Sequence, residues 1–313
     1  MSGRKSADGQ AFLLMLLLCA IWGGQQVSIK LAAGDIAPVM QVALRSIISG
    51  LLMLIPLCWS GAWSAGKGTR RVGMLAGSLF ALEFCLVAVG LQYTSASHMV
   101  VFLYTAPIFS ALGLHLLLPS ERLRALQWMG IGLCFVGIGV AFSGGFSRSL
   151  DSNVLIGDAL GVLAGLAWGA TTVVVRCTKL SDAPPSLTLF YQLSMAVVLL
   201  LAYAGVSGQL GHVRLTGVSV ASLMFQGLVV SFFSFFMWFW LLRRYRAANL
   251  GVFTFMTPLF GVTFGVLILD EQLAPSFIAA ALLVLAGIGL VNGEALLRRA
   301  FGLRTVGSAD ARQ

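Results

Sequence analysis

The chain has 313 residues, of which 58 % are hydrophobic and only 10 % charged, with 36 glycines and a net charge of +9. Soluble domains carry roughly 25 % charged residues, so this composition excludes an ordinary soluble protein and indicates a helical protein that crosses the lipid bilayer many times. The positive charge does not indicate a nucleic-acid partner, because basic residues gather in the cytoplasmic loops of membrane proteins.

Apolar runs that approach the ~20 residues needed to cross a bilayer follow one another along the chain. In order, we predict membrane spans at 11–33, 38–59, 72–93, 96–118, 126–143, 156–176, 186–206, 217–242, 247–269 and 275–296. Several connections are only a few residues long, so neighbouring spans must be antiparallel. The sequence therefore predicts an all-α integral membrane protein with ten transmembrane helices.

Lysine and arginine are distributed unevenly between the two sides of these spans. If the N-terminus is cytoplasmic, sixteen basic residues fall on the inner side, whereas Lys30, Arg148 and Arg214 fall on the outer side and Arg45 lies inside a span. Positive charge concentrates on the cytoplasmic side of membrane proteins. We expect a multi-pass protein of the plasma (inner) membrane with both termini in the cytoplasm.

A motif near the start of the chain returns 146 residues later. Trp22-Gly23 in the first span corresponds to Trp168-Gly169 in the sixth. Three further landmarks recur in the same order: Pro107 and Pro258, Glu121 and Glu271, and Gly137-Ile-Gly139 and Gly287-Ile-Gly289. Self-similarity of this kind indicates an internal duplication, which we place at residues 1–149 and 150–313.

Each unit contains five predicted helices, an odd number. The second unit must therefore enter the membrane from the opposite face, so that the two repeats are inverted. Inverted repeats place a substrate site at their interface and allow alternating access in many transporters. We expect a central cavity between the two units.

The chain resembles the drug/metabolite transporter superfamily in its ten-helix form with two EamA-type repeats. The resemblance is carried by the two Trp-Gly pairs, Arg45, the paired prolines and the paired glutamates, and it covers nearly the whole chain. It implies secondary export of amino acids and related small metabolites, without a cofactor. At the position that corresponds to Arg45, the second unit has Tyr191-Gln192. The resemblance therefore does not imply that the two units carry equivalent charged residues here.

Other functions are weighed against export of amino acids. A drug or hydrophobic-cation effluxer of the same superfamily is the first alternative, although the first span lacks the membrane-embedded acid that such effluxers commonly use. A membrane sensor is a more distant alternative. We expect no enzyme activity and no metal site, because the three scattered histidines and five cysteines show no catalytic or metal-ligand spacing.

Trp22 and Trp168 are candidates for the cavity wall, since both lie near the middle of a span rather than at the headgroup level. Gln26 and Thr172 follow them by one helical turn. The alternative is that the tryptophans pack on glycine and the polar residues join helices.

Glu83 is the only acid near the centre of a span, and ionisable residues inside the membrane are usually functional. It could bind a substrate ammonium or couple transport to a proton, or it could be a neutral structural carboxyl. Arg45 could bind a substrate carboxylate by two hydrogen bonds, but we favour a structural or gating role for it.

Pro107 and Pro258 each remove a backbone hydrogen bond at equivalent positions of the fourth and ninth spans. We expect them to act as hinges, with a static bend as the alternative. The full set of expected substrate-binding residues is Trp22, Gln26, Glu83, Tyr104, Trp168, Thr172, Gln192, Trp238 and Phe255. This aromatic lining favours neutral and aromatic amino acids, threonine and methionine.

Paired glycines recur in the fifth and tenth spans, at Gly130, Gly132, Gly137, Gly139, Gly287 and Gly289. Small residues of this kind favour close contact between helices, either within one chain or between two chains. The sequence is therefore compatible with a monomer or a homodimer.

Overall fold

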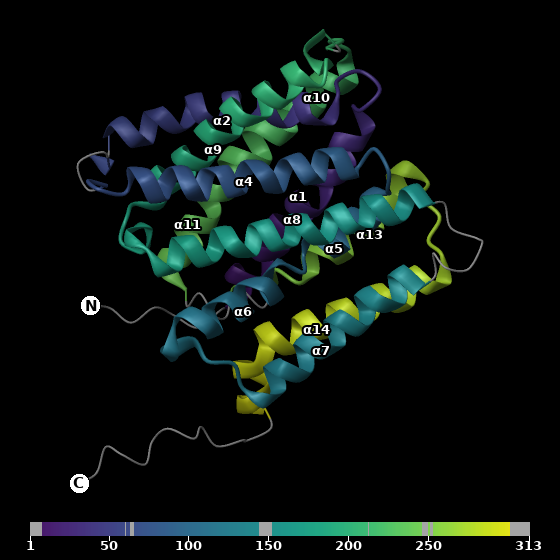
Figure 1. Cartoon of the computed structure of the whole chain (residues 1–313). Helices are drawn as coiled ribbons and strands as arrows, with labels where there is room; N and C mark the ends of the chain where they lie inside the picture. Colours follow the sequence, from purple (N-terminus) through teal and green to yellow (C-terminus); the bar gives the residue numbers. More distant parts are fainter. Residues whose placement is uncertain are drawn as a thin grey trace.

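The computed structural model describes residues 8–59, 61–62, 66–143, 152–211, 213–245, 250 and 253–300, and over these residues the chain is helical (Figure 1). The longer helices are α1 (Gly9–Leu31), α2 (Pro38–Trp59), α4 (Arg70–Gly90), α5 (Ala96–Leu103), α6 (Ala106–Leu117), α7 (Ala125–Ser143), α8 (Ser152–Cys177), α9 (Pro185–Val206), α10 (Gly217–Met224), η4 (Phe225–Phe233), α11 (Ser234–Arg244), α13 (Met256–Leu269) and α14 (Pro275–Ala300). The short 3-10 turns are η1 (Pro119–Glu121), η2 (Lys179–Ser181) and η3 (Gln209–Gly211).

Eight helical stretches in the described part of the chain are long and apolar enough to cross a membrane. They coincide with the first eight predicted spans. The ninth and tenth predicted spans fall on shorter apolar stretches, α13 (Met256–Leu269) and the part of α14 at Pro275–Val291. Part of the ninth span, at residues 247–249 and 251–252, lies outside the described residues. The chain is therefore a multi-pass helical membrane protein.

The fourth predicted span is broken in the middle. Helix α5 ends at Leu103, a turn follows at Tyr104 and Thr105, and α6 begins at Ala106 with Pro107 in its first turn. A proline is tolerated in the first turn of a helix, where its missing N–H would have no partner. The proline therefore starts a new helix here instead of bending a continuous one.

The ninth predicted span repeats this arrangement. A turn at Thr254 and Phe255 precedes α13, and Pro258 lies in the first turn of that helix. The two breaks thus lie just before equivalent prolines. Discontinuous helices are found where membrane transporters bind their substrates.

The eighth predicted span is continuous but not uniformly α-helical. Between α10 and α11 the nine residues Phe225–Phe233 form a π-helix, η4. Helical segments of this type are rare and are frequent at functional sites.

The helices pack mainly across the two predicted units. Helix α1 lies along α13, whereas α8 lies along α5 and α6, and α9 packs against both α2 and α4. Helices α7 and α14 lie side by side as a pair at one edge of the bundle (Figure 1). Large apolar side chains such as Leu116 and Leu267 are 81 % and 72 % exposed on the outside of the bundle, as lipid-facing side chains are in a membrane protein.

Candidate functional site

A cavity of about 830 Å³ lies inside the bundle and is lined by residues from α1, α2, α4, α5, α6, α8, η2, α9, η4 and α11 and from the turns before α6 and α13. Eight of the nine expected substrate-binding residues line it: Trp22, Gln26, Glu83, Tyr104, Trp168, Thr172, Gln192 and Trp238. Arg45 and Pro107 also line it. The structure therefore brings most of the predicted site together around one space.

Phe255 and Pro258 lie elsewhere. Phe255 packs against the main hydrophobic core, and the preceding Thr254 lines the cavity in its place. Pro258 is buried in the first turn of α13. Tyr104 stands at the equivalent position before Pro107 and does line the cavity, so the two breaks direct these side chains differently.

Trp22 both packs and lines the cavity. Its indole Nε1–H donates a hydrogen bond to Ser234 Oγ at 2.9 Å, and its ring meets Trp238 edge to face with 5.8 Å between the ring centroids. The indole N–H is therefore satisfied, as a buried tryptophan requires. The ring is held in one orientation at the cavity wall.

Trp168 forms the corresponding wall from the other unit. It meets Tyr104 edge to face at 5.2 Å between ring centroids. The hydroxyls of Thr171 and Thr172 donate to the carbonyls of Ala167 and Trp168 at 2.9 and 3.1 Å. Because their protons are used within the helix, these hydroxyls offer acceptor oxygens to the cavity.

The glycine of each Trp-Gly pair has a separate role. A Cβ atom on Gly23 would lie 2.7 Å from the backbone nitrogen of Gly261 in α13, and one on Gly169 would lie 2.9 Å from the backbone nitrogen of Ser110 in α6. No real side chain fits at such distances. Each first helix of a unit therefore touches the helix that follows the break in the other unit, with its tryptophan beside the cavity.

Arg45 and Glu83 are the most deeply buried charged residues of the cavity wall, 2 % and 4 % exposed. The Arg45 guanidinium lies over the Phe84 ring, 4.2 Å from its centroid. Neither a hydrogen bond nor an ion pair joins Arg45 to Glu83, although both residues belong to the described part of the chain. A buried charged group without a partner is costly, so both residues call for a functional explanation.

Phe80 and Phe84 were not predicted as site residues, yet both line the cavity beside Glu83. Their rings contact each other at 4.8 Å between centroids. Phe80 precedes Glu83 by three residues, so it lies near the same face of α4. The three-residue spacing from Glu83 could have indicated that Phe80 lies near the cavity. Spans of this chain contain many phenylalanines at such spacings from polar residues, so the spacing alone does not identify a site residue.

The cavity reaches the surface at one end of the bundle, where α8 ends and α9 begins. Its lining there includes the exposed residues Arg176, Ser181 and Pro185. The guanidinium of Arg176 forms an ion pair with Glu121, and both side chains are exposed. We call this the Arg176 end.

The opposite end, where α1 ends and α5 begins, is held together by polar contacts. The Glu271 carboxylate accepts hydrogen bonds from the Ala96 and Ser97 backbone N–H groups at 2.6 and 2.9 Å and from Ser97 Oγ at 2.6 Å. It thus caps the N-terminus of α5, where a negative charge is favourable. Lys30 Nζ donates to the carbonyl oxygen of Thr94.

Two backbone features bring Glu271 to this position. Asp270 adopts a left-handed conformation at φ 53°, which turns the chain back at the end of α13. A Cβ atom on Gly265 would lie 2.5 Å from Glu271 Oε2, so only glycine leaves room for the carboxylate. We call this end the Lys30 end.

A second set of contacts joins α10 and η4 to α1 and α2 at the Lys30 end. The side-chain amide of Gln226 donates to Gln41 Oε1 at 2.9 Å, and Ile36 forms an antiparallel bridge with Val213. Ser28 and Ser222 share a hydrogen bond of 2.8 Å between their hydroxyls. The cavity is thus sealed at this end by both units.

His98 belongs to this region and not to the cavity. Its ring stacks on Phe277 at 3.7 Å between centroids, and Nδ1 lies 2.9 and 3.0 Å from the two carboxylate oxygens of Asp158. Thr94 Oγ1 donates to the same carboxylate at 2.6 Å. The ring of His98 is therefore held by Phe277 and, through Nδ1, by Asp158.

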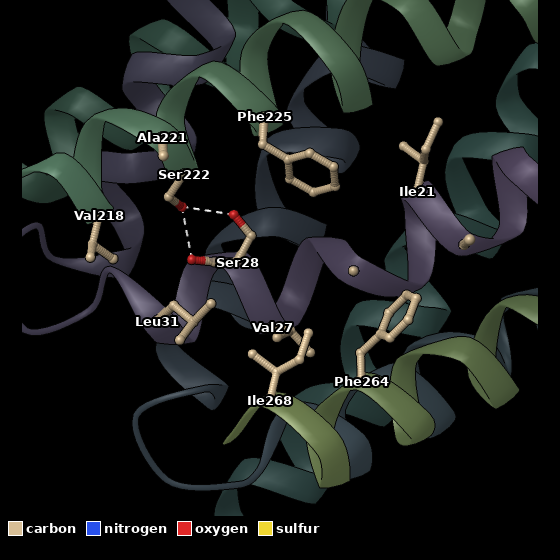
Figure 2. A pocket seen from close by; sticks show the side chains of 12 residues that line it. Ile21, Val27, Ser28, Leu31, Val218, Ala221, Ser222, Phe225, Phe264 and Ile268 are labelled. Carbon is tan, nitrogen blue, oxygen red and sulfur yellow. Dashed lines mark hydrogen bonds between the residues drawn. The ribbon is translucent and has the colours of Figure 1, made fainter. Parts of the chain in front are cut away.

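A smaller pocket of about 520 Å³ lies between α1, α10, η4 and α13 (Figure 2). Phe225 and Phe264 approach it from different helices, and its two serines bond to each other (Figure 2). Its hydroxyls are therefore already satisfied, and the charged residues that line the large cavity do not reach it.

The arrangement of a polar and aromatic cavity, open at one end, within a bundle of membrane helices agrees with comparisons to known proteins. The model of the EamA-like transporter family matches residues 9–143 and again residues 155–293. The chain belongs to the EamA-like transporter family. Its family is one of transporters and not of enzymes, so this EamA-like protein is a membrane protein that moves a small molecule across the bilayer.

Relatives of this EamA-like transporter span almost its full length. An "Uncharacterized transporter" of Archaeoglobus fulgidus is 24 % identical, over 92 % of this chain and 99 % of the relative. A "Probable amino-acid metabolite efflux pump" of Salmonella typhimurium is 24 % identical, over 88 % of this chain and 92 % of the relative. A solved crystal structure, 16 % identical, covers 96 % of this chain and 100 % of that chain with a TM-score of 0.63, which shows a shared fold.

Proposed function

We propose that the protein is a secondary transporter that exports amino acids and related small metabolites from the cytoplasm by alternating access. The observation that carries this proposal is the central cavity, which holds opposite charges and aromatic rings, opens at the Arg176 end and is sealed at the Lys30 end. The similarity to a relative named as an amino-acid metabolite efflux pump supports the substrate class.

The orientation follows from the distribution of basic residues. Sixteen of them fall on the side of the predicted spans that includes Arg176, and basic residues favour the cytoplasmic side. The Arg176 end then faces the cytoplasm, and both termini lie on that side of the plasma membrane. In this state the cavity accepts substrate from inside the cell.

An inverted relation between residues 1–149 and 150–313 would allow the two ends to exchange roles. Gly23 against α13 corresponds to Gly169 against α6. Lys30 and Glu271 both bond to the segment 94–97 at one end of the cavity, and the equivalent residues Arg176 and Glu121 form an ion pair at the opposite end. This correspondence supports rocking of one unit against the other, with hinges at the breaks before Pro107 and Pro258.

The proposal is tested by flux measurements with purified protein in liposomes. Labelled amino acids are loaded inside the liposomes, and their release is followed with and without an imposed pH gradient. We expect release of neutral amino acids. If none of the twenty is released, amino-acid transport is wrong. An acceleration by the gradient that disappears in Glu83→Gln would support proton coupling.

The drug-efflux alternative is tested with the same liposomes. The positively charged Arg45 in the cavity wall disfavours a purely cationic substrate. We therefore expect a fluorescent hydrophobic cation to be moved no faster than in protein-free liposomes. Faster movement of the cation than of every amino acid would favour the alternative.

Replacing either cavity tryptophan should slow transport without unfolding the protein. We expect Trp22→Ala and Trp168→Ala each to lower the apparent affinity for an amino acid about 2- to 10-fold, because an aromatic contact is worth about 0.5–1.5 kcal/mol. Trp59→Ala is the matched control, since Trp59 is 87 % exposed and does not line the cavity. Unchanged flux in both cavity variants, with monodisperse protein, would assign these tryptophans to packing alone.

Neutralising Glu271 should loosen the seal at the Lys30 end. Glu271→Gln retains the shape but loses hydrogen bonds to a charged group, which are worth about 1.5–3 kcal/mol each. The reporter is a cysteine introduced into the cavity wall by Gln25→Cys in a protein without its native cysteines. We expect an impermeant maleimide added outside to label this cysteine faster in Glu271→Gln than in the parent. The control is Asp270→Asn, an exposed neighbouring acid. Equal labelling in Glu271→Gln and its parent would show that the carboxylate does not hold the seal.

A further inference from the structure

Three deeply buried polar atoms in the wall of the large cavity have no hydrogen-bond partner: Gln26 Oε1, Arg45 Nη1 and Glu83 Oε2. Their side chains are 2 %, 2 % and 4 % exposed. Most buried polar groups in proteins are paired, and each exception requires a reason. One cavity thus carries an unpaired guanidinium donor, an unpaired carboxyl oxygen and an unpaired amide oxygen.

Arg45 and Glu83 come from different helices, α2 and α4, which pack against each other. Both side chains line the same cavity, yet they do not form a direct ion pair within 4.0 Å. If Arg45 and Glu83 served only to stabilise the fold, a direct ion pair between them would be the most favourable arrangement. Two buried charges that are held apart are left uncompensated. Instead, the guanidinium is supported by the Phe84 ring, which leaves its N–H donors available.

This pair of charges selects between classes of ligand. A monoanion gains from Arg45 but is repelled by Glu83, and a monocation meets the opposite situation. A ligand with a carboxylate and an ammonium gains from both, since each charge meets its opposite in a site with little water. Gln26 Oε1 is a further acceptor for an ammonium group.

The remaining residues of the cavity wall indicate which kind of side chain the ligand has. Two edge-to-face aromatic pairs line the space, Trp22 with Trp238 and Trp168 with Tyr104. Among the described lining residues, the remaining charged side chain is Arg176, which lies exposed at the mouth. A side chain held deep in the cavity would therefore meet aromatic surface and uncharged polar groups.

Resting on the proposed transport function, we infer that Arg45 and Glu83 together recognise the zwitterionic end of an α-amino acid with an uncharged side chain. Arg45 binds the α-carboxylate through bidentate hydrogen bonds, for which its planar guanidinium is suited. Glu83 binds the α-ammonium, with Gln26 as a second acceptor. The aromatic pairs bind the side chain and tolerate differences in its size and shape.

The test combines substrate analogues with matched variants in the liposome assay. The neutral amino acid released fastest by the parent protein is competed with its N-acetyl derivative, which lacks the ammonium, and with its amide, which lacks the carboxylate. In the parent we expect both analogues to compete at least about tenfold more weakly than the amino acid, as loss of one charged hydrogen-bond pair predicts.

The variants assign each charge to one end of the substrate. We expect Glu83→Gln to weaken competition by the amino acid at least about tenfold, while the N-acetyl derivative competes as well as before or better, since that analogue has no ammonium to lose and is no longer repelled by Glu83. We expect Arg45→Gln to weaken competition by the amino acid, while the amide competes as well as before or better. Arg45→Lys keeps the charge but not the planar guanidinium. Competition by the amino acid in this variant should be weaker than in the parent and stronger than in Arg45→Gln.

The outcomes separate this inference from the transport function. If the parent releases amino acids but both single-charge analogues compete as well as the amino acid, the zwitterion site is wrong while transport stands. If each variant weakens every analogue equally, Arg45 and Glu83 act in structure or gating. If the parent releases no amino acid, the proposed function itself fails. Should a variant not fold, the parent's discrimination between the three competitors still decides.

Discussion

Replacing Gly23 with alanine should destabilise the protein by about 1–3 kcal/mol, the usual cost of overpacking a tight contact. The new Cβ would lie 2.7 Å from the backbone nitrogen of Gly261 and 2.9 Å from the carbonyl oxygen of Thr257. Both neighbours are backbone atoms of α13, so they cannot rotate away and the two helices must separate. We expect a lower apparent melting temperature in detergent, together with reduced flux because Trp22 is displaced.

The control for this prediction is the adjacent residue. A Cβ atom on Gly24 would have its nearest neighbour at 3.5 Å, the tip of the Phe225 ring, which is an ordinary van der Waals distance. Alanine is favoured over glycine in a helix by about 1 kcal/mol. Gly24→Ala should therefore be neutral or stabilising. An equal loss of stability in the two variants would show that α1 and α13 do not meet through Gly23.

Replacing Gly287 with alanine should separate α14 from α7. A Cβ atom on Gly287 would lie 2.5 Å from the carbonyl oxygen of Gly130 and 2.8 Å from the backbone nitrogen of Cys134. The cost is again about 1–3 kcal/mol, because backbone must move. Loss of this contact is expected to lower the apparent melting temperature. A cysteine pair placed across the two helices should also crosslink more slowly.

Gly289→Ala provides the matched control two residues further along the same helix. A Cβ atom on Gly289 would have no neighbour within 4 Å, so we expect the helix-propensity gain of about 1 kcal/mol without a clash. If Gly289→Ala were as destabilising as Gly287→Ala, the pairing of α7 with α14 would involve another face of α14. A change of oligomeric state in Gly289→Ala alone would indicate that this face meets a second chain.

These glycines show where prediction from sequence reaches its limit. The sequence identifies Gly130, Gly132, Gly287 and Gly289 as a set that favours close helix contact. The structure separates them: Gly130 and Gly287 face each other, whereas a Cβ atom on Gly132 or Gly289 would meet nothing within 4 Å. The spacing cannot make this distinction, because residues two apart lie on nearly opposite helix faces and either face could be the one in contact.

The candidate site was largely predictable for a physical reason. Polar and ionisable side chains near the middle of a span cannot face lipid without cost, so residues such as Gln26 and Glu83 had to face the protein interior. The sequence did not show that Arg45 and Glu83 share one wall of the cavity, since they lie 38 positions apart on different helices. The sequence also did not show that Tyr104 lines the cavity whereas Phe255, at the equivalent position, packs against the main hydrophobic core.

The sequence by itself determined that the chain is a multi-pass helical membrane protein with landmarks that recur along it, because apolar length and charge distribution depend only on local composition. The tertiary structure alone decided that Pro107 and Pro258 lie in the first turns of new helices and that a π-helix interrupts the eighth span. It also decided which end of the cavity is sealed. These features depend on the partner that each backbone group and each carboxylate finds across the bundle. The partner of Glu271, at the start of α5, lies about 175 residues away along the chain.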